Sequence, residues 1–199
     1  MDGLKVFRPL GVCLVLAFQV GPTDAPDRIL RAEVVVPASL EQVWNAWTTE
    51  SGIRTFFAPD ARVDLRVDGL YEILFNPAAP VGQRGSEGMR ILDLEPMTRF
   101  AFTWSAPPHL PRARAQRTEV ILEFTALGDK TTRLRLTHLG WGQGGEWDQA
   151  YAYFDHAWCA VVLPAFKYRF EKGPIDWIAR PQLAPIADSI AVELAPSGS

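Results

Sequence analysis

Histidine is the residue type in this sequence that could transfer protons near neutral pH, and it occurs only at His109, His138 and His156. The same side chain is a common metal ligand. None of the three stands in the short His-x-x-x-His spacing that is typical of metal sites. The sequence also lacks a phosphate-binding loop and a dinucleotide fingerprint. We therefore predict neither a metal site nor a cofactor.

His138 is the candidate for acid–base catalysis. It lies on a predicted strand, residues 130–139, on the same face as apolar side chains, so its imidazole is expected to point into the interior. Asp93 and Glu87 could face inward from a neighbouring strand region. No G-x-S-x-G motif or other nucleophile accompanies the histidine. The sequence therefore favours a His138 that hydrogen-bonds in the core or anchors a ligand, and it leaves an enzyme role open but less favoured.

Aromatic side chains indicate a ligand pocket more strongly than the histidines indicate catalysis, with 7 Trp and 11 Phe in 199 residues. Large rings with a polar edge line ligand pockets as well as filling cores. The predicted elements bring many of these rings to one end of the interior, where Phe56 and Phe57 could form a lid. The predicted ligand-binding residues are Phe56, Phe57, Phe75, Trp104, His138, Trp141, Trp147, Tyr151, Phe154 and Trp158. A ligand suited to such a set is small and apolar or amphipathic.

The elements that must position these residues follow from periodicity. Residues 29–36 alternate in the manner of a half-buried strand, and Ser39 with Gln42 forms a capping box that starts the first of two short helices. Short turns such as Asp68-Gly69 then predict antiparallel pairing. Further strands are predicted at residues 61–67, 70–75, 88–94, 99–104, 118–127 and 130–139.

One long helix is predicted from Glu146 to about Lys172, because large apolar residues recur there every three or four positions. Pro164 is expected to kink it or mark a weak turn. The order of elements predicts an α+β fold, in which a curved antiparallel sheet of about seven strands wraps around a long C-terminal helix, with two short helices after the first strand. A sheet bent this strongly around one helix leaves an internal cavity.

Composition excludes several classes of function. The net charge of −3 argues against a nucleic-acid surface, which needs a clustered positive field. The basic group Arg112, Arg114 and Arg117 lies in a proline-rich segment and is predicted to be a solvated loop. Cys13 and Cys159 stand near opposite ends of the chain, so a disulfide framework is not expected.

The chain divides into three predicted parts. Residues 1–27 form a leader or signal-like segment and linker, in which Lys5 and Arg8 precede an apolar run. That run is too short for a membrane span, which takes about 20 residues, so no integral span is expected once any leader is removed. Residues 28–177 form the folded domain and residues 178–199 a mobile tail. Export to the periplasm or medium and a cytoplasmic location both stay open, because no clean cleavage site follows the leader.

The stretch VVVPASLEQVWNAW, from Val34 to Trp47, resembles the opening of the SRPBCC (START/Bet v 1-like) superfamily. Within it, the chain is similar to the group called activator of Hsp90 ATPase homologue 1-like, through residues 88–104, 118–127 and 132–142. Many members have Pro-Gly-Gly where this chain has Val-Asp-Gly after its second predicted strand.

This resemblance implies a helix-grip fold with a hydrophobic pocket. It also implies a range of functions, from lipid and hormone binding to polyketide cyclisation and cochaperone work, so the fold is poor evidence for one activity. Our first hypothesis is binding of a small hydrophobic or amphipathic ligand. The alternatives are a cyclase- or hydrolase-like enzyme that uses His138, and an interaction module with a chaperone partner.

Overall fold

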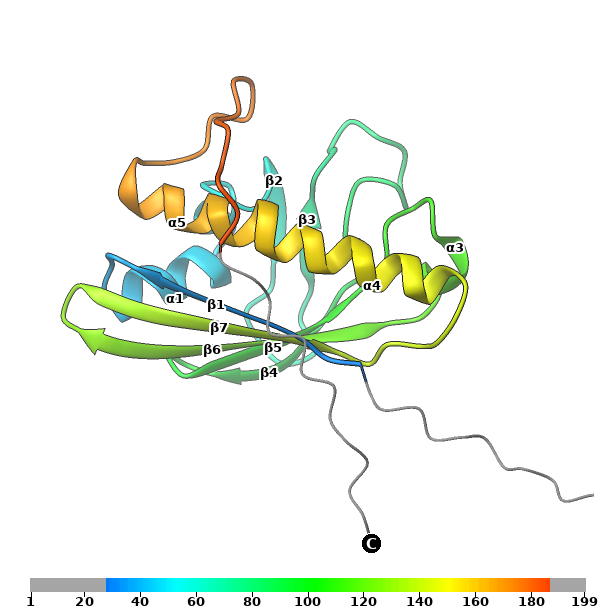
Figure 1. Cartoon of the computed structure of the whole chain (residues 1–199), viewed down its shortest axis with the longest axis horizontal. Coiled ribbons are helices and arrows are strands. Elements are labelled where there is room, and N and C mark those ends of the chain that lie inside the picture. Colours follow the sequence, from blue (N-terminus) through cyan, green and yellow to red (C-terminus); the bar gives the residue numbers. More distant parts are fainter. Residues whose placement is uncertain (1–27, 187–199) are drawn as a thin grey trace, which may run out of the picture.

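The computed structural model describes residues 28–186. The predicted leader and the end of the predicted tail, residues 187–199, lie outside the described residues. Within the described part, the fold is α+β, as the order of elements predicts. A long helix crosses one face of an antiparallel sheet, and short helices and a strand pair close the sides (Figure 1).

The main sheet has five antiparallel strands in the order β1-β7-β6-β5-β4. Its first and last strands in sequence, β1 and β7, pair along their whole length, with Leu30 opposite His138. Alternating burial places one face of each long strand against the helix. The strands are β1 (Leu30–Val36), β4 (Ile91–Glu95), β5 (Arg99–Trp104), β6 (Thr118–Gly128) and β7 (Thr131–Leu139).

A second sheet pairs β2 (Asp60–Val63) with β3 (Tyr71–Leu74). Both strands are shorter than the sequence predicts, and Asp68-Gly69 does not form a tight hairpin between them. The reason is that the backbone around the turn bonds to β4 instead: the N–H of Asp68 donates to the carbonyl of Ile91, and the N–H of Ile91 donates to the carbonyl of Gly69. These bonds join the two sheets into one curved wall.

Two short helices follow β1, as predicted: α1 (Leu40–Thr48) and α2 (Glu50–Ile53). Ser39 and Gln42 form the expected capping box at the start of α1. Trp44 packs edge-on against Phe124 of β6, with ring centroids 5.3 Å apart, so α1 is fixed on the sheet. A further short helix, α3 (Pro111–Arg114), was not predicted.

The long C-terminal helix consists of α4 (Glu146–His156), a π-helical segment η1 (Ala157–Val162) and α5 (Leu163–Glu171). It runs without a break across the sheet, instead of kinking at Pro164 (Figure 1). Because Pro164 has no N–H, the carbonyl four residues before it loses its α-helical partner. The wider π turns of η1 lie directly before this proline. The widened turns leave the Cys159 carbonyl available to Ile186, whose N–H donates to it at 3.0 Å.

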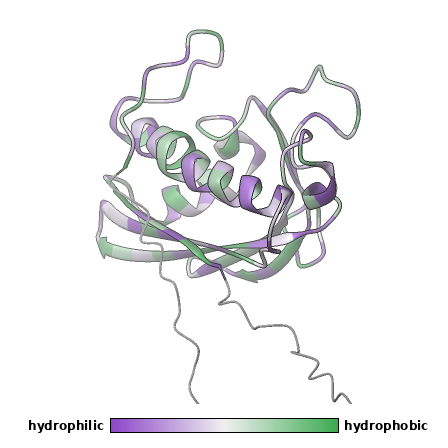
Figure 2. Cartoon of the chain, turned by 45° about the vertical axis from the view of Figure 1, so that its right-hand side comes forward, coloured by the Kyte–Doolittle hydropathy of each residue, from purple (hydrophilic) through white to green (hydrophobic). Residues whose placement is uncertain are grey.

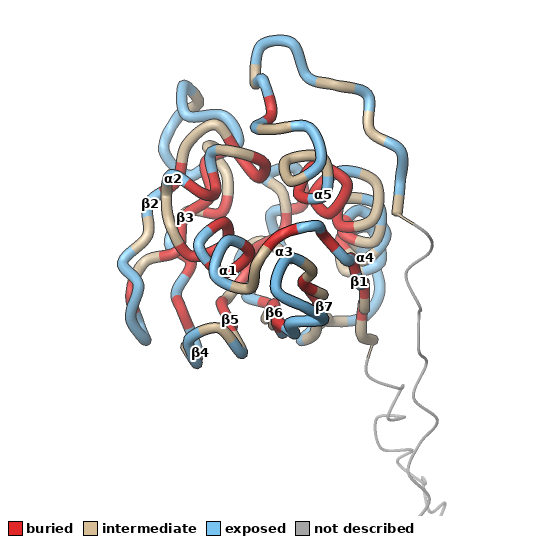
Figure 3. Tube along the Cα trace, turned by 90° about the vertical axis from the view of Figure 1, so that its left-hand side faces the viewer, coloured by how far each residue is buried: buried red, intermediate tan, exposed pale blue. Residues whose placement is uncertain are grey.

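The core lies between the sheet and the helix. Buried residues face this interior from every wall, and exposed residues cover the outside (Figure 3). Hydrophobic and hydrophilic residues alternate along the strands and the helix, which is the pattern expected of elements with one buried face (Figure 2). Beyond the predicted domain boundary at residue 177, Leu183 and Ile186 still pack against this core.

Candidate ligand-binding pocket

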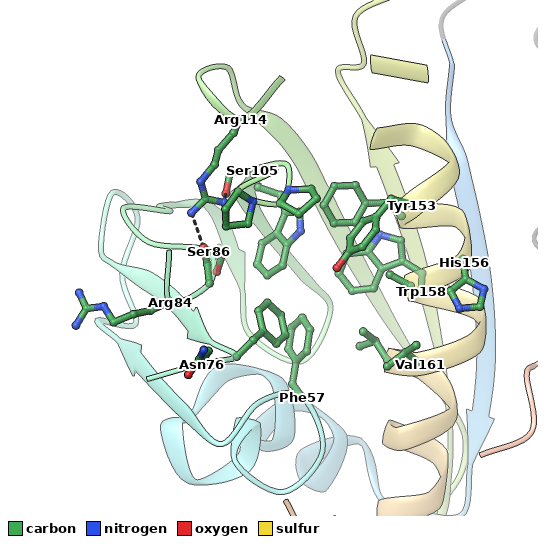
Figure 4. Close-up of a pocket in the computed structure, with 18 of the residues that line it drawn as sticks. Phe57, Asn76, Arg84, Ser86, Ser105, Arg114, Tyr153, His156, Trp158 and Val161 are labelled. Atoms are coloured by element: carbon green, nitrogen blue, oxygen red, sulfur yellow. Dashed lines mark hydrogen bonds between the residues drawn. The ribbon is translucent and has the colours of Figure 1, made fainter. Parts of the chain in front are cut away.

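A pocket of about 370 Å³ lies beside the long helix, between that helix and the segments that follow β3 and β5 (Figure 4). Small-molecule sites in proteins range from about 300 to 1,000 Å³. Most of the wall is apolar. Its apolar residues come from the segment between α2 and β2, the segments after β3 and β5, the end of β5 and the long helix. The apolar lining residues are Phe57, Phe75, Trp104, Pro107, Pro108, Phe154, Ala157, Trp158, Val161 and Val162.

Four rings form the innermost part of this wall. Phe57 and Trp104 stack with their planes 15° apart and their centroids separated by 5.8 Å. Phe75 meets the edge of Trp104 at 6.5 Å, and Trp158 lies 5.9 Å from it on the helix side. Phe75 and Trp158 are inclined at 84° and 44° to the Trp104 ring, so the rings form a concave apolar wall, which suits an apolar group of a ligand.

Local structure explains why these rings share one place. Strand β5 buries Phe100, Phe102 and Trp104 on the same face, since side chains alternate along a strand. Trp104 is the last residue of β5, so it reaches the end of the sheet where the pocket begins. On the helix, Phe154 and Trp158 are four residues apart and therefore lie one above the other.

The polar side of the pocket is built around Arg114 of α3. Its guanidinium donates to the hydroxyl of Ser105 at 3.3 Å and to the carbonyls of Ala106, Gly82 and Gly85 at 2.6, 2.9 and 2.7 Å. Burial lowers the pKa of Arg114 below its usual value. The side chain ties the β3–β4 loop to the segment after β5, so it is not the solvated loop residue that the sequence predicts.

Five of the ten predicted ligand-binding residues line this pocket. The sequence places them there through the helical stripe and the strand alternation. They are Phe57, Phe75, Trp104, Phe154 and Trp158.

The other five predicted residues lie elsewhere. Phe56 is 2% exposed and packs against the core ring Phe166 at 4.9 Å, so it is not a lid. Trp147 and Trp141 pack on a second, smaller apolar cluster at the α3 end of the helix. Tyr151 lies against Trp141, with the two ring centroids 5.2 Å apart. Trp147 and Tyr151 lie nearer the start of the helix, and the pocket faces a stripe that includes Tyr153, Ala157 and Val161.

His138, the fifth, is fully buried and is held by two hydrogen bonds. The indole Nε1–H of Trp158 donates to Nδ1 at 3.0 Å, so the ring proton must sit on Nε2, which donates to the Thr118 hydroxyl at 2.8 Å. Thr118 in turn reaches the carbonyl of Trp104 at 3.4 Å. Burial lowers the pKa of His138 well below its usual value of 6.5. The imidazole is therefore neutral at pH 7 and has no ring nitrogen free for a ligand.

Several pocket residues carry no signal in the sequence. Ser86, Ser105 and Arg114 come from loops and a single helical turn, and Tyr153 lies one position from the predicted stripe. A regular pattern of spacing could not have found them, because each is brought to the pocket by contacts between distant segments. The remaining polar lining residues are Asn76, Gln83, Arg84, His156 and Arg180.

Two kinds of feature are absent from the part of the chain that the structure describes. Between residues 28 and 186, no His, Cys, Asp and Glu side chains gather in a group of three or more that could hold a metal ion. None of the helices in the same range has both the length and the apolar character needed to cross a membrane.

Comparisons with known proteins place this geometry in context. Residues 37–163 match the family described as activator of Hsp90 ATPase homolog 1-like protein. A comparison with curated proteins found no match.

Solved structures show the same fold at low sequence identity. The Aha1 protein from Colwellia psychrerythraea is 20% identical, with a TM-score of 0.56, over 73% of this chain and 97% of that one. An HSP90 activator from Plasmodium falciparum is 18% identical, with a TM-score of 0.55, over 74% and 97%. CalU16 from Micromonospora echinospora is 22% identical, with a TM-score of 0.51, over 76% and 79%.

Proposed function

The chain belongs to the activator of Hsp90 ATPase homologue 1-like family, and from this premise we propose that it binds a small hydrophobic or amphipathic ligand in the pocket beside the long helix. The observation that carries the proposal is the ring wall itself. Phe57, Trp104 and Trp158 are at most 4% exposed as residues, yet they border about 370 Å³ of space. Concave apolar space of this size with a few polar groups is the usual form of a ligand site.

An enzyme that uses His138 is less well supported by the same geometry. A general base must come within hydrogen-bond reach of the proton it removes. His138 is 0% exposed and does not line the pocket, and both of its ring nitrogens are already bonded. Its contacts support a structural role, in which the histidine holds Trp158 of the helix against β6 and β7.

A chaperone-associated role is the second candidate. The family description and the similar structure from Plasmodium falciparum both refer to activation of Hsp90. Faster ATP hydrolysis by purified Hsp90 on addition of this protein would support this role.

A pocket-filling substitution tests the proposed function. Val161 is 47% exposed and points into the pocket from the helix (Figure 4), so Val161→Trp would fill the space without disturbing the core. We expect the neutral fluorescent probe N-phenyl-1-naphthylamine to bind the wild type at one saturable site and the variant at least about 10-fold more weakly, since the ring wall is covered.

Leu127→Trp is the matched control, because Leu127 is 51% exposed at the far end of β6 and does not line the pocket. This variant should bind the probe as the wild type does. Equal binding by wild type and Val161→Trp would refute the pocket as the site.

A further inference from the structure

Polar groups with no partner point to the chemistry of the ligand. Trp104 is 2% exposed, and its indole N–H makes no hydrogen bond to any described residue, although the ring lines the pocket. Ser86 is also 2% exposed; its oxygen accepts from the N–H of Ile73 at 2.9 Å, and its own proton has no acceptor among the described residues. Both groups are donors, and both residues line the pocket, so these donors are open to an acceptor on a ligand.

The charged side chains that line the pocket are all positive. Arg114 forms its four hydrogen bonds to neutral oxygens, and no carboxylate among the described residues forms an ion pair with it. No Asp or Glu lines the pocket. The other nearby arginine, Arg84, is paired with Glu87 at 2.7 Å and extends away from the pocket (Figure 4). The guanidinium of Arg114 therefore places a positive charge on the pocket wall with no carboxylate in direct contact, although Glu87 acts on it electrostatically from farther away.

These donors lie together. Ser105 directly follows Trp104 in the chain and accepts from Arg114, and Gly85, which precedes Ser86, also accepts from Arg114. In Figure 4 the guanidinium of Arg114 lies beside Ser105 and Ser86, on the side of the pocket away from Phe57. The pocket thus has an apolar part lined by rings and, next to it, a corner with hydrogen-bond donors and a positive charge.

We propose that the ligand is an apolar molecule that carries one carboxylate, with the carboxylate seated in the corner formed by Trp104, Ser86, Ser105 and Arg114. This inference rests on the proposed function, and it adds the class of the ligand. The carboxylate accepts from the Trp104 N–H and the Ser86 hydroxyl, and such charge-assisted bonds are about twice as strong as those between neutral groups. The terminal N–H groups of Arg114 already donate to protein oxygens, so Arg114 contributes its charge. A neutral apolar ligand would leave the donors unsatisfied.

A pair of probes that differ in one group tests the proposal. Anthracene-9-carboxylate and anthracene-9-methanol share their rings, and only the first is charged at pH 7.5. Fluorescence titration of the full chain should show at least about 10-fold tighter binding of the carboxylate, as one charge-assisted hydrogen bond predicts.

Variants locate the source of that preference. Trp104→Phe keeps the ring and removes the N–H, so it should weaken binding of the carboxylate about 5-fold and leave the alcohol unchanged. Arg114→Gln removes the charge and should abolish the remaining preference. Arg112→Gln is the control: Arg112 also lies on α3, but its side chain is 91% exposed and outside the pocket.

Each outcome decides between the claims. Equal affinities for the two probes would overturn the anionic ligand and leave the proposed pocket standing. A preference that survives both Trp104→Phe and Arg114→Gln would overturn the assigned corner. Failure of both probes to bind would overturn the ligand proposal together with the proposed function. Because Arg114→Gln could loosen the loops that Arg114 holds, the result for Trp104→Phe decides if that variant does not fold.

Discussion

His138 lies among three rings, with centroids 4.2 Å from Trp141, 5.1 Å from Phe154 and 6.0 Å from Trp158. Its two ring nitrogens bond to the helix through Trp158 and to β6 through Thr118. The strand alternation correctly places this residue in the interior. The hydrogen-bond partners that make it structural could not be predicted, since they come from segments 20 residues away in both directions.

Acidic pH should destabilise the fold through His138. The unfolded chain binds a proton on this residue near pH 6.5, whereas burial lowers the folded-state pKa well below that value. The stability that neutral His138 contributes is therefore complete above pH 6.5 and is lost as the pH falls towards the folded-state pKa. We expect the free energy of unfolding to fall by up to about 1.4 kcal/mol per pH unit through this group, measured by urea denaturation.

His138→Gln separates this effect from other titrations. The amide oxygen can accept from Trp158, and glutamine does not titrate. The advantage of the wild type over the variant should shrink as the pH falls below 6.5. Parallel stability curves for the two proteins would contradict the account of His138.

At the scale of elements, periodicity predicted the strands and the long helix well, because alternation and helical stripes depend on which face is buried. It failed where backbone groups bond to distant segments. Asp68-Gly69 has the composition of a hairpin turn, but its backbone bonds to Ile91. The π turns before Pro164 were missed because a proline predicts a lost hydrogen bond but not which of the preceding turns widens.

The capping box of α1 offers a test at this scale. The N–H of Gln42 donates to the Ser39 hydroxyl at 3.3 Å, and the N–H of Ser39 donates to the Gln42 side chain at 3.0 Å. Ser39→Ala removes the first bond and should lower the free energy of unfolding by about 1 kcal/mol. Thermal or urea denaturation measures this loss.

Ser51→Ala is the control for this substitution, because the exposed Ser51 hydroxyl contacts only that of Thr49. Its free energy of unfolding should stay within about 0.5 kcal/mol of the wild type. If Ser39→Ala is as stable as this control, the capping box does not contribute to the stability of α1.

For the whole molecule, the sequence predicts an internal cavity between sheet and helix, but core side chains fill that interior, and the pocket lies beside the helix, against the segments after β3 and β5. The helical stripe of Trp147, Tyr151, Phe154 and Trp158 runs past the pocket, and only its last two members line it. Trp147, at the start of the stripe, packs on the small apolar cluster that includes Ala113 of α3, a helix that the sequence did not predict. The position of the pocket was therefore set by a contact between distant loops, which Arg114 holds together.

The indole N–H signals of the tryptophans, followed by NMR in ¹⁵N-labelled protein during titration with N-phenyl-1-naphthylamine, test the central claim most directly. The account predicts large shifts for Trp104 and Trp158, which line the pocket. It predicts a much smaller shift for Trp177, whose N–H donates to the carbonyl of Arg54 outside the pocket and which meets the pocket only through Arg180, 4.9 Å from its ring. Shifts confined to Trp177, or none at Trp104 on saturation with the probe, would contradict a ligand site beside the long helix.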